Sequence, residues 1–286
     1  MSRALLERPF ITVVELFPPL VPSTPGRRAK VDLADLQRRF VDSVRPISRL
    51  ADCFLVADLK DPSQEQISPV QSAAILKAEL GLDAAPVVVA RDGNKRSVAT
   101  SVVTAFALGI DSIFLAWGDR YSGAAQPANV YDYGSLAELI SETRALSRTL
   151  GIDAAILAPV DLSAGGGGPR LGRKRLAAGA DLLIAQPPTT DSTVSLSAHE
   201  TILRGAGLSR RVLLGAFPFR GQDDARQCAE KFGWQLPPQL FKLAARGRRA
   251  LDAENRRVVK SARERGLRGV CVSTRGEPRT AAPMLA

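Results

Sequence analysis

The chain of 286 residues contains little histidine and cysteine, few aromatic residues and no long apolar run. His199 is the one histidine, and the cysteines are Cys53, Cys228 and Cys271. Because these thiols stand far apart, without a CxxC pair, the sequence indicates neither a disulfide framework nor a zinc site. It favours a reducing, cytoplasmic setting. No apolar run approaches the roughly 20 residues of a membrane-spanning helix, and the first eight residues are too polar for a signal peptide.

Positive charge is in excess, but aromatic partners for it are scarce. Lys and Arg number 39 against 29 Asp and Glu, which gives a net charge of +10, while aromatic residues make up only 5% of the chain. The basic residues are spread over many segments, and none of these alternates with aromatic residues that could stack on bases. We therefore expect solvated helix faces that attract small anionic ligands, and no nucleic-acid partner.

A regular alternation of short apolar runs and amphipathic stretches is present throughout. The runs are rich in Val, Ile and Leu and predict strands near residues 11–17, 52–57, 86–90, 112–116, 153–158, 181–186, 211–216 and 268–273. Helices are expected near 33–48, 69–80, 96–108, 135–149, 171–178, 192–206, 223–231 and 247–265, with extra helical material at 236–246. This pattern favours an α/β fold, a single (β/α)₈ TIM barrel over residues 1–286, with a short C-terminal tail from about residue 274.

Polar residues end three of the expected strands. Glu15 follows Ile11-Thr12-Val13-Val14, Asp119 follows the fourth strand, and Gln186 closes the sixth. Side chains at the carboxyl ends of barrel strands surround the mouth, where ligands bind. A carboxylate there acts as a general acid if its surroundings raise its pKa. The alternative for Glu15 is that it caps a neighbouring main-chain amide.

Several segments, in the same order and at similar spacing, resemble methylenetetrahydrofolate reductases. The most specific is RKRLAAGADLLIAQP at 173–187, followed by VELFPP at 14–19 and WGD at 117–119. The resemblance extends to segments 91–94, 130–132 and 215–219 and so covers most of the chain. It implies a flavin-bearing (β/α)₈ barrel that reduces 5,10-methylenetetrahydrofolate to 5-methyltetrahydrofolate, with hydride from NADH or NADPH passing through FAD.

The resemblance also implies roles for individual residues. Glu15 matches the acid that opens the folate imidazolidine ring, and Asp119 matches the carboxylate between flavin and pterin. Gln186 matches the amide that holds the substrate, and Gln222 is a weaker substrate-binding candidate. The residues expected to contact FAD are Arg91, Asn94, Trp117, Gly118, Asp119, Tyr131 (or Tyr133) and Lys174.

The chain departs from the family pattern around the flavin. Many relatives have a histidine after the third strand and another after the fifth, whereas His199 is expected on the surface of the sixth helix, far from both. Trp117 stands where an arginine is frequent. Two alternatives therefore remain open: a flavin-free relative that transfers hydride directly or serves a catabolic one-carbon pathway, and a folate- or flavin-binding partner subunit. A homo-oligomer is a further alternative.

Overall fold

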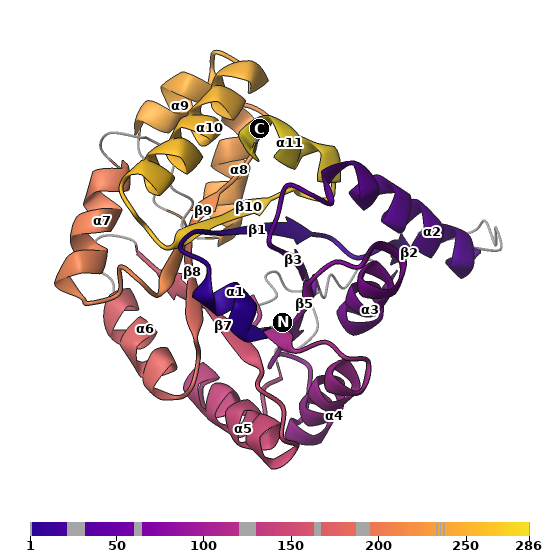
Figure 1. Cartoon of the computed structure of the whole chain (residues 1–286). Coiled ribbons are helices and arrows are strands. Elements are labelled where there is room, and N and C mark those ends of the chain that lie inside the picture. Colours follow the sequence, from indigo (N-terminus) through magenta and orange to yellow (C-terminus); the bar gives the residue numbers. More distant parts are fainter. Residues whose placement is uncertain are drawn as a thin grey trace.

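Eight parallel strands close into a barrel, with helices around it (Figure 1). The computed structural model of the protein describes residues 2–21, 32–59, 65–119, 130–162, 167–186, 195–232, 234, 236 and 238–285. The barrel strands are β1 (Ile11–Leu16), β3 (Cys53–Val56), β5 (Ala84–Val89), β6 (Ser112–Ala116), β7 (Ala155–Asp161), β8 (Leu182–Gln186), β9 (Val212–Ala216) and β10 (Gly269–Ser273). Their order around the barrel is β1-β10-β9-β8-β7-β6-β5-β3. The predicted (β/α)₈ barrel is confirmed.

The helices follow the strands much as the periodicity predicts. They are α1 (Ser2–Glu7), α2 (Leu33–Val44), η1 (Arg45–Ile47), α3 (Pro69–Leu80), α4 (Lys95–Ala107), α5 (Leu136–Thr149), α6 (Gly168–Ala177), α7 (Ser195–Gly205), α8 (Gln222–Phe232), α9 (Pro238–Ala244), α10 (Arg248–Glu264), η2 (Pro278–Ala281) and α11 (Ala282–Leu285). A small antiparallel pair, β2 (Leu20–Val21) and β4 (Glu65–Gln66), lies outside the barrel sheet. The segment after β10, expected as a tail, forms η2 and α11, where Ala281 and Met284 are buried.

Alternate side chains of each strand divide the core into two parts. One set points into the barrel, where Ile11, Val13, Cys53 and Cys271 pack with their counterparts from the other strands. The other set packs outward against the helices, as Val14 and Val56 do. Because both faces of the sheet are covered, the strands are apolar along nearly their whole length, which is the pattern the sequence shows.

Helix α1 closes the end of the barrel opposite the mouth. Leu5 is buried against the barrel-interior cluster, and Leu6 packs against it. The Arg268 guanidinium, directly before β10, donates to the main-chain oxygens of Leu6 and Arg8. These bonds hold the end of α1 against the start of β10. The mouth that opens to ligands is therefore at the carboxyl ends of the strands.

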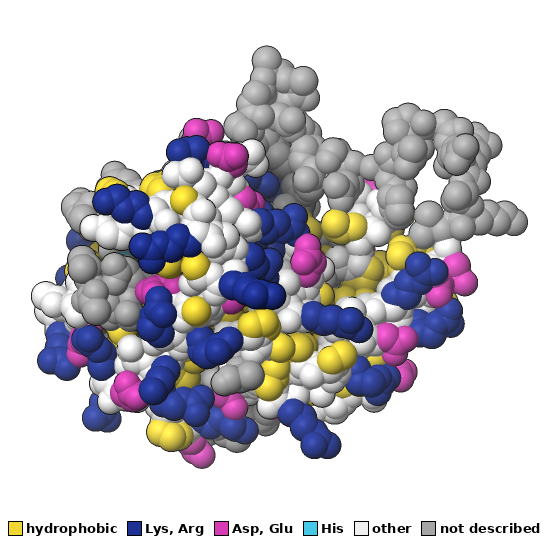
Figure 2. All heavy atoms as spheres, turned by 90° about the horizontal axis from the view of Figure 1, so that it is seen from above, with side chains coloured by type: hydrophobic (Ala, Val, Ile, Leu, Met, Phe, Trp, Pro, Cys, Tyr) yellow, Lys and Arg dark blue, Asp and Glu magenta, His cyan; other side chains and the backbone are white. Residues whose placement is uncertain are grey.

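Lys and Arg side chains are scattered over the face shown in Figure 2, with Asp and Glu among them. In the described part of the chain, no helix combines the length and apolar character that crossing a bilayer requires. Within those same residues, no cluster of His, Cys, Asp and Glu could hold a metal ion.

Candidate active site

Glu15 points into the barrel mouth from the penultimate position of β1, on the same face as Ile11 and Val13. Its main-chain oxygen accepts bonds from the Thr274 amide at 3.1 Å and the Thr274 hydroxyl at 2.8 Å. Burial raises the pKa of the Glu15 carboxyl, a hydrogen bond from the Ser273 side chain opposes the shift, and the negative charge of Asp119 adds to it. Glu15 and Asp119 thus share one rim, and Glu15 has the raised pKa that a proton donor needs.

Residues from the ends of β5 and β6 hold the Asp119 segment in place. The Arg91 side chain is buried, with 4% of the residue exposed. Its guanidinium pairs with Asp92 at 3.1 Å and donates to the main-chain oxygen of Asp119. Gly118, at φ +89°, lies so close that a Cβ there would stand 2.8 Å from the Arg91 Cβ. Only glycine can adopt this φ without strain and leave room for the Arg91 side chain, which explains the glycine of the WGD motif.

Two aromatic rings complete this part of the rim. Trp117 and Tyr131 stack with their ring centroids 4.6 Å apart and an interplanar angle of 6°. The Tyr131 hydroxyl donates to the Gly118 main-chain oxygen at 3.3 Å. Tyr133, the alternative, is buried, and burial raises its pKa to about 12. Five of the expected cofactor residues therefore meet at one place: Arg91, Trp117, Gly118, Asp119 and Tyr131.

The expected substrate amides lie at the same end of the barrel. Gln186 ends β8, is exposed, and follows Leu182 and Ile184 on the inward-facing side of the strand. Its main-chain oxygen accepts from the Leu162 amide at 2.7 Å, beside the pairing of Asp161 with Gln186. Gln222 is the partly exposed first residue of α8, soon after β9. Glu15, Asp119 and Gln186 thus stand at one rim, as predicted from the strand ends.

Two residues expected at the cofactor have other positions. The Asn94 side chain caps α4, because its Oδ1 accepts from the Ser97 amide at 2.8 Å. Lys174 is exposed at the seventh position of α6. At 1.5 Å of rise per residue, it lies about 9 Å along the axis from the helix end at the mouth.

Arg175, which the sequence argument passed over, occupies the inner side of α6. Its half-buried guanidinium donates to the Pro159 main-chain oxygen. Burial lowers its pKa, and the charge of Asp161 opposes that shift. The signal was the helical phase: Gly168 and Gly172 face the barrel, and a Cβ on Gly168 would lie 1.7 Å from the Asp161 main-chain oxygen. Seven residues after Gly168, Arg175 faces the same way and Lys174 does not.

The surface position expected for His199 is wrong. This residue is buried in α7, with 7% exposed, and burial lowers its pKa to about 4, while the negative charge of Asp161 opposes the shift. Asp161 ends β7, the fifth strand of the barrel. His199 therefore lies within electrostatic range of the fifth strand end, where the sequence argument expected no histidine. Periodicity alone did not show that this face of α7 packs inward.

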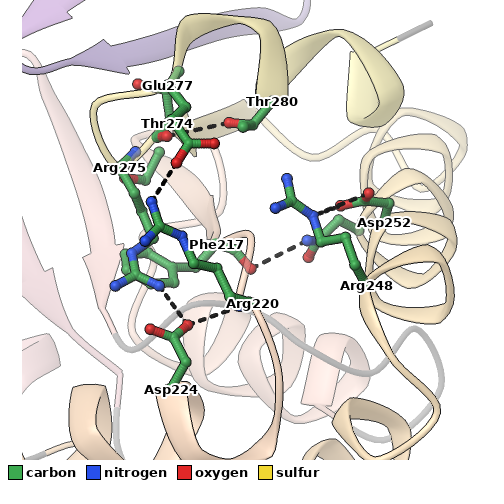
Figure 3. A network of polar contacts seen from close by, with 11 residues as sticks. Phe217, Arg220, Asp224, Arg248, Asp252, Thr274, Arg275, Glu277 and Thr280 are labelled. Atoms are coloured by element: carbon green, nitrogen blue, oxygen red, sulfur yellow. Dashed lines mark hydrogen bonds and ion pairs between the residues drawn. The ribbon is translucent and has the colours of Figure 1, made fainter.

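A polar network joins the ends of β9 and β10 (Figure 3). Asp224 accepts from the Arg220 amide at 2.8 Å and from the Arg275 guanidinium, whose cation lies 5.2 Å from the Phe217 ring centroid. Arg220 also pairs with Glu277. Thr274, which binds the Glu15 main-chain oxygen, directly precedes Arg275, so the network anchors the segment that contacts the main chain of Glu15.

A cavity of about 390 Å³ opens beside the rim, between the ends of β3 and β5 and the first turns of α3 and α4. Its described lining includes Asp58, Asp92 and Ser97, but not Glu15, Asp119 or Gln186. The volume lies within the usual range for small-molecule sites. The rim and the cavity are adjoining but separate features.

No protein-family model and no curated protein matches this sequence. Solved structures of similar shape include a 2,3-dimethylmalate lyase of the PEP mutase/isocitrate lyase superfamily, 12% identical, with a TM-score of 0.55 over 98% of this chain and 78% of that one. Oxaloacetate acetylhydrolase in complex with oxalate is 14% identical, with a TM-score of 0.55 over 98% and 81%. A class V chitinase from Nicotiana tobaccum is 13% identical, with a TM-score of 0.50 over 97% and 99%. At such identities the likeness shows the barrel fold alone.

Proposed function

We propose that the protein is an enzyme that reduces 5,10-methylenetetrahydrofolate to 5-methyltetrahydrofolate with hydride from a reduced nicotinamide. The observation that carries the proposal is the position of Glu15, a partly buried carboxyl of raised pKa at the same rim as Asp119 and Gln186. The resemblance of the segments around these three residues to methylenetetrahydrofolate reductases supports it. A barrel that only bound folate would have little need of an acid there.

The chemistry assigns a task to each residue. Glu15 donates a proton to a nitrogen of the imidazolidine ring, the C–N bond breaks, and the methylene carbon becomes an iminium. A hydride then adds to that carbon and gives the methyl group, so that one proton and one hydride are consumed. Asp119 accepts hydrogen bonds from the pterin, and Gln186, with a donor and an acceptor, orients it.

For the path of the hydride, two candidates stand. The resemblance implies FAD, which would be held by the residues at the ends of β5 and β6. This set fits FAD poorly, because Arg91 is bonded to Asp92 and Asp119, Asn94 caps α4, and Lys174 is exposed. That placement favours the second candidate, in which the nicotinamide gives its hydride directly to the folate.

One experiment tests the activity and separates the two paths. The visible spectrum of the purified protein is recorded, and the oxidation of NADH or NADPH and the formation of methyltetrahydrofolate are followed with and without added FAD. Folate-dependent oxidation that needs no flavin supports direct transfer, and turnover only with FAD supports the flavin path. Protein that binds folate but gives no methyltetrahydrofolate with either nucleotide, with or without FAD, would refute the proposed reduction and leave the partner-subunit alternative.

A further inference from the structure

The cavity between β3 and β5 exists because these two strands separate before they reach the rim. Their pairing runs from Phe54 and Ala84 to Val56 and Pro86 and stops there, whereas β5 continues to Val89. The last three residues of β5 therefore have no partner residues in β3 and line the cavity instead. The cavity lies at the carboxyl end of β5, between this strand and helices α3 and α4.

The lining of the cavity combines hydrogen-bond acceptors with apolar walls. Asp58 is held in place by the Gln66 amide, which donates to its carboxylate at 2.7 Å, while Asp92 is held by Arg91. Ser97 and Ser101 line the α4 side, and their hydroxyls donate to the main-chain oxygens of Asn94 and Ser97, which leaves the hydroxyl oxygens as acceptors. The apolar walls come from Pro69, Val70, Val87, Val89 and Val98. None of the described lining residues is Lys or Arg.

We propose that this cavity holds a nucleoside portion of the hydride donor, with Asp58 and Asp92 accepting hydrogen bonds from ribose hydroxyls. A carboxylate at a ribose diol is a recurrent means of binding dinucleotides. The apolar walls receive the flat base, and the hydroxyls of Ser97 and Ser101 supply further polar contacts. Asp92 is paired with Arg91, but no Lys or Arg is among the described lining residues, so a phosphate ester on the ribose would face two carboxylates and we expect the cavity to prefer NADH over NADPH.

The cavity is well placed to serve the rim. It lies beside β5, whose end carries Arg91, and Arg91 connects Asp92 of the cavity to the main chain of Asp119. On its other side, β3 separates it from β1 and Glu15. In this proposal the rest of the dinucleotide extends past the end of β5 toward Asp119. The inference rests on the proposed function for the identity of the ligand, but its test is a binding measurement that needs no turnover.

Binding of NADH and NADPH is measured by titration of nucleotide fluorescence with the full-length protein. We expect NADH to bind at least about tenfold more tightly than NADPH, because like charges in apposition weaken binding strongly. Ser101→Phe places a large side chain toward the cavity and should weaken NADH binding at least about tenfold. Thr104→Phe, at an exposed position of the same helix, is the matched control and should bind NADH as the wild type does.

A second variant keeps the test decisive if Ser101→Phe does not fold. Asp58→Asn with Asp92→Asn removes both charges, keeps an acceptor for Gln66 and retains a residue type that tolerates φ +59° at position 92. It should narrow the preference for NADH over NADPH. Equal wild-type affinities, equal NADH binding by Ser101→Phe and Thr104→Phe, or loss of methyltetrahydrofolate binding alone in Ser101→Phe would overturn the assignment. Absence of folate turnover with these nucleotide results intact would instead refute the proposed function.

Discussion

Replacement of Glu15 by glutamine separates proton donation from a structural role. Glutamine keeps an oxygen that accepts from Ser273 and leaves the main-chain bonds to Thr274 intact. If Glu15 is the acid, the folate reaction should slow by about 10²–10⁴-fold. That is about 3–5 kcal/mol of barrier at 1.36 kcal/mol per decade. If Glu15 only holds its neighbours, glutamine keeps its hydrogen bond from Ser273, and the rate of the folate reaction should fall at most about tenfold.

The pH dependence of stability adds a second measurement on the same variant. Because the pKa of Glu15 is raised in the folded state, the folded protein holds this proton more tightly than the unfolded chain does. The wild-type free energy of unfolding should therefore fall as the pH rises from the ordinary pKa of Glu through the folded pKa. Glu15→Gln lacks this loss, so it should melt at the same temperature as the wild type or higher at neutral pH.

The assays are folate-dependent NADH oxidation, methyltetrahydrofolate binding and thermal melting. Glu79→Gln, on the exposed side of α3, is the control and should change none of them. The reasoning fails if Glu15→Gln reduces folate at the wild-type rate. It fails equally if the variant loses activity because it melts at a lower temperature and no longer binds folate.

Three further predictions concern the rim and its support. Gly118→Ala should cost about 1–3 kcal/mol of folding free energy, measured by denaturant unfolding, through strain at φ +89° and a Cβ clash. Gly151→Ala, at φ +68° in open space, should cost only the backbone penalty of about 1–2 kcal/mol, and equal losses would remove the clash argument. The wild-type free energy of unfolding should decline as the pH falls from 6.5 to about 4, because His199 takes up a proton over this range in the unfolded chain but not when it is buried in the folded protein. His199→Asn should remove roughly 3 kcal/mol of that dependence, and an unchanged pH profile would contradict the burial. Lys174→Met should leave folding and NADH oxidation unchanged, while Arg175→Met should lower the melting temperature. If Lys174 faced the mouth, Lys174→Met would instead slow NADH oxidation, and Arg175→Met would leave the melting temperature unchanged.

The barrel was predictable because the strands are buried on both faces and several helices, α2 most clearly, carry an apolar stripe. Glycine at the helix ends was equally informative, since Gly81, Gly109 and Gly266 all adopt positive φ after their helices. Strand ends were less certain. The fifth barrel strand was expected to stop at residue 158, before Pro159, but it continues to Asp161 because parallel pairing with β8 persists through the proline.

The site was predictable where strand ends decide position and less so where helix rotation does. Glu15, Asp119 and Gln186 follow from the parallel sheet, whose carboxyl ends must meet. Lys174 and His199 lie on helices, where a step of one residue turns a side chain by about 100°. The stripe on each helix was too short in sequence to fix that rotation. The cavity could not be foreseen either, because it depends on where two strands cease to pair.

Helix α1 closes the end of the barrel opposite the mouth, and the buried thiols in the barrel interior can serve as probes of local opening. Helix α1 has six residues, too few to be stable alone, so packing of Leu5 and the bonds from Arg268 hold it in place. Cys53 and Cys271 lie in the barrel interior, in the same apolar cluster as Leu5. Burial raises the pKa of both thiols, so they are unreactive while the barrel interior stays closed to solvent. The rate at which a thiol reagent labels Cys53 and Cys271 under native conditions should therefore report local opening of the barrel interior that they line.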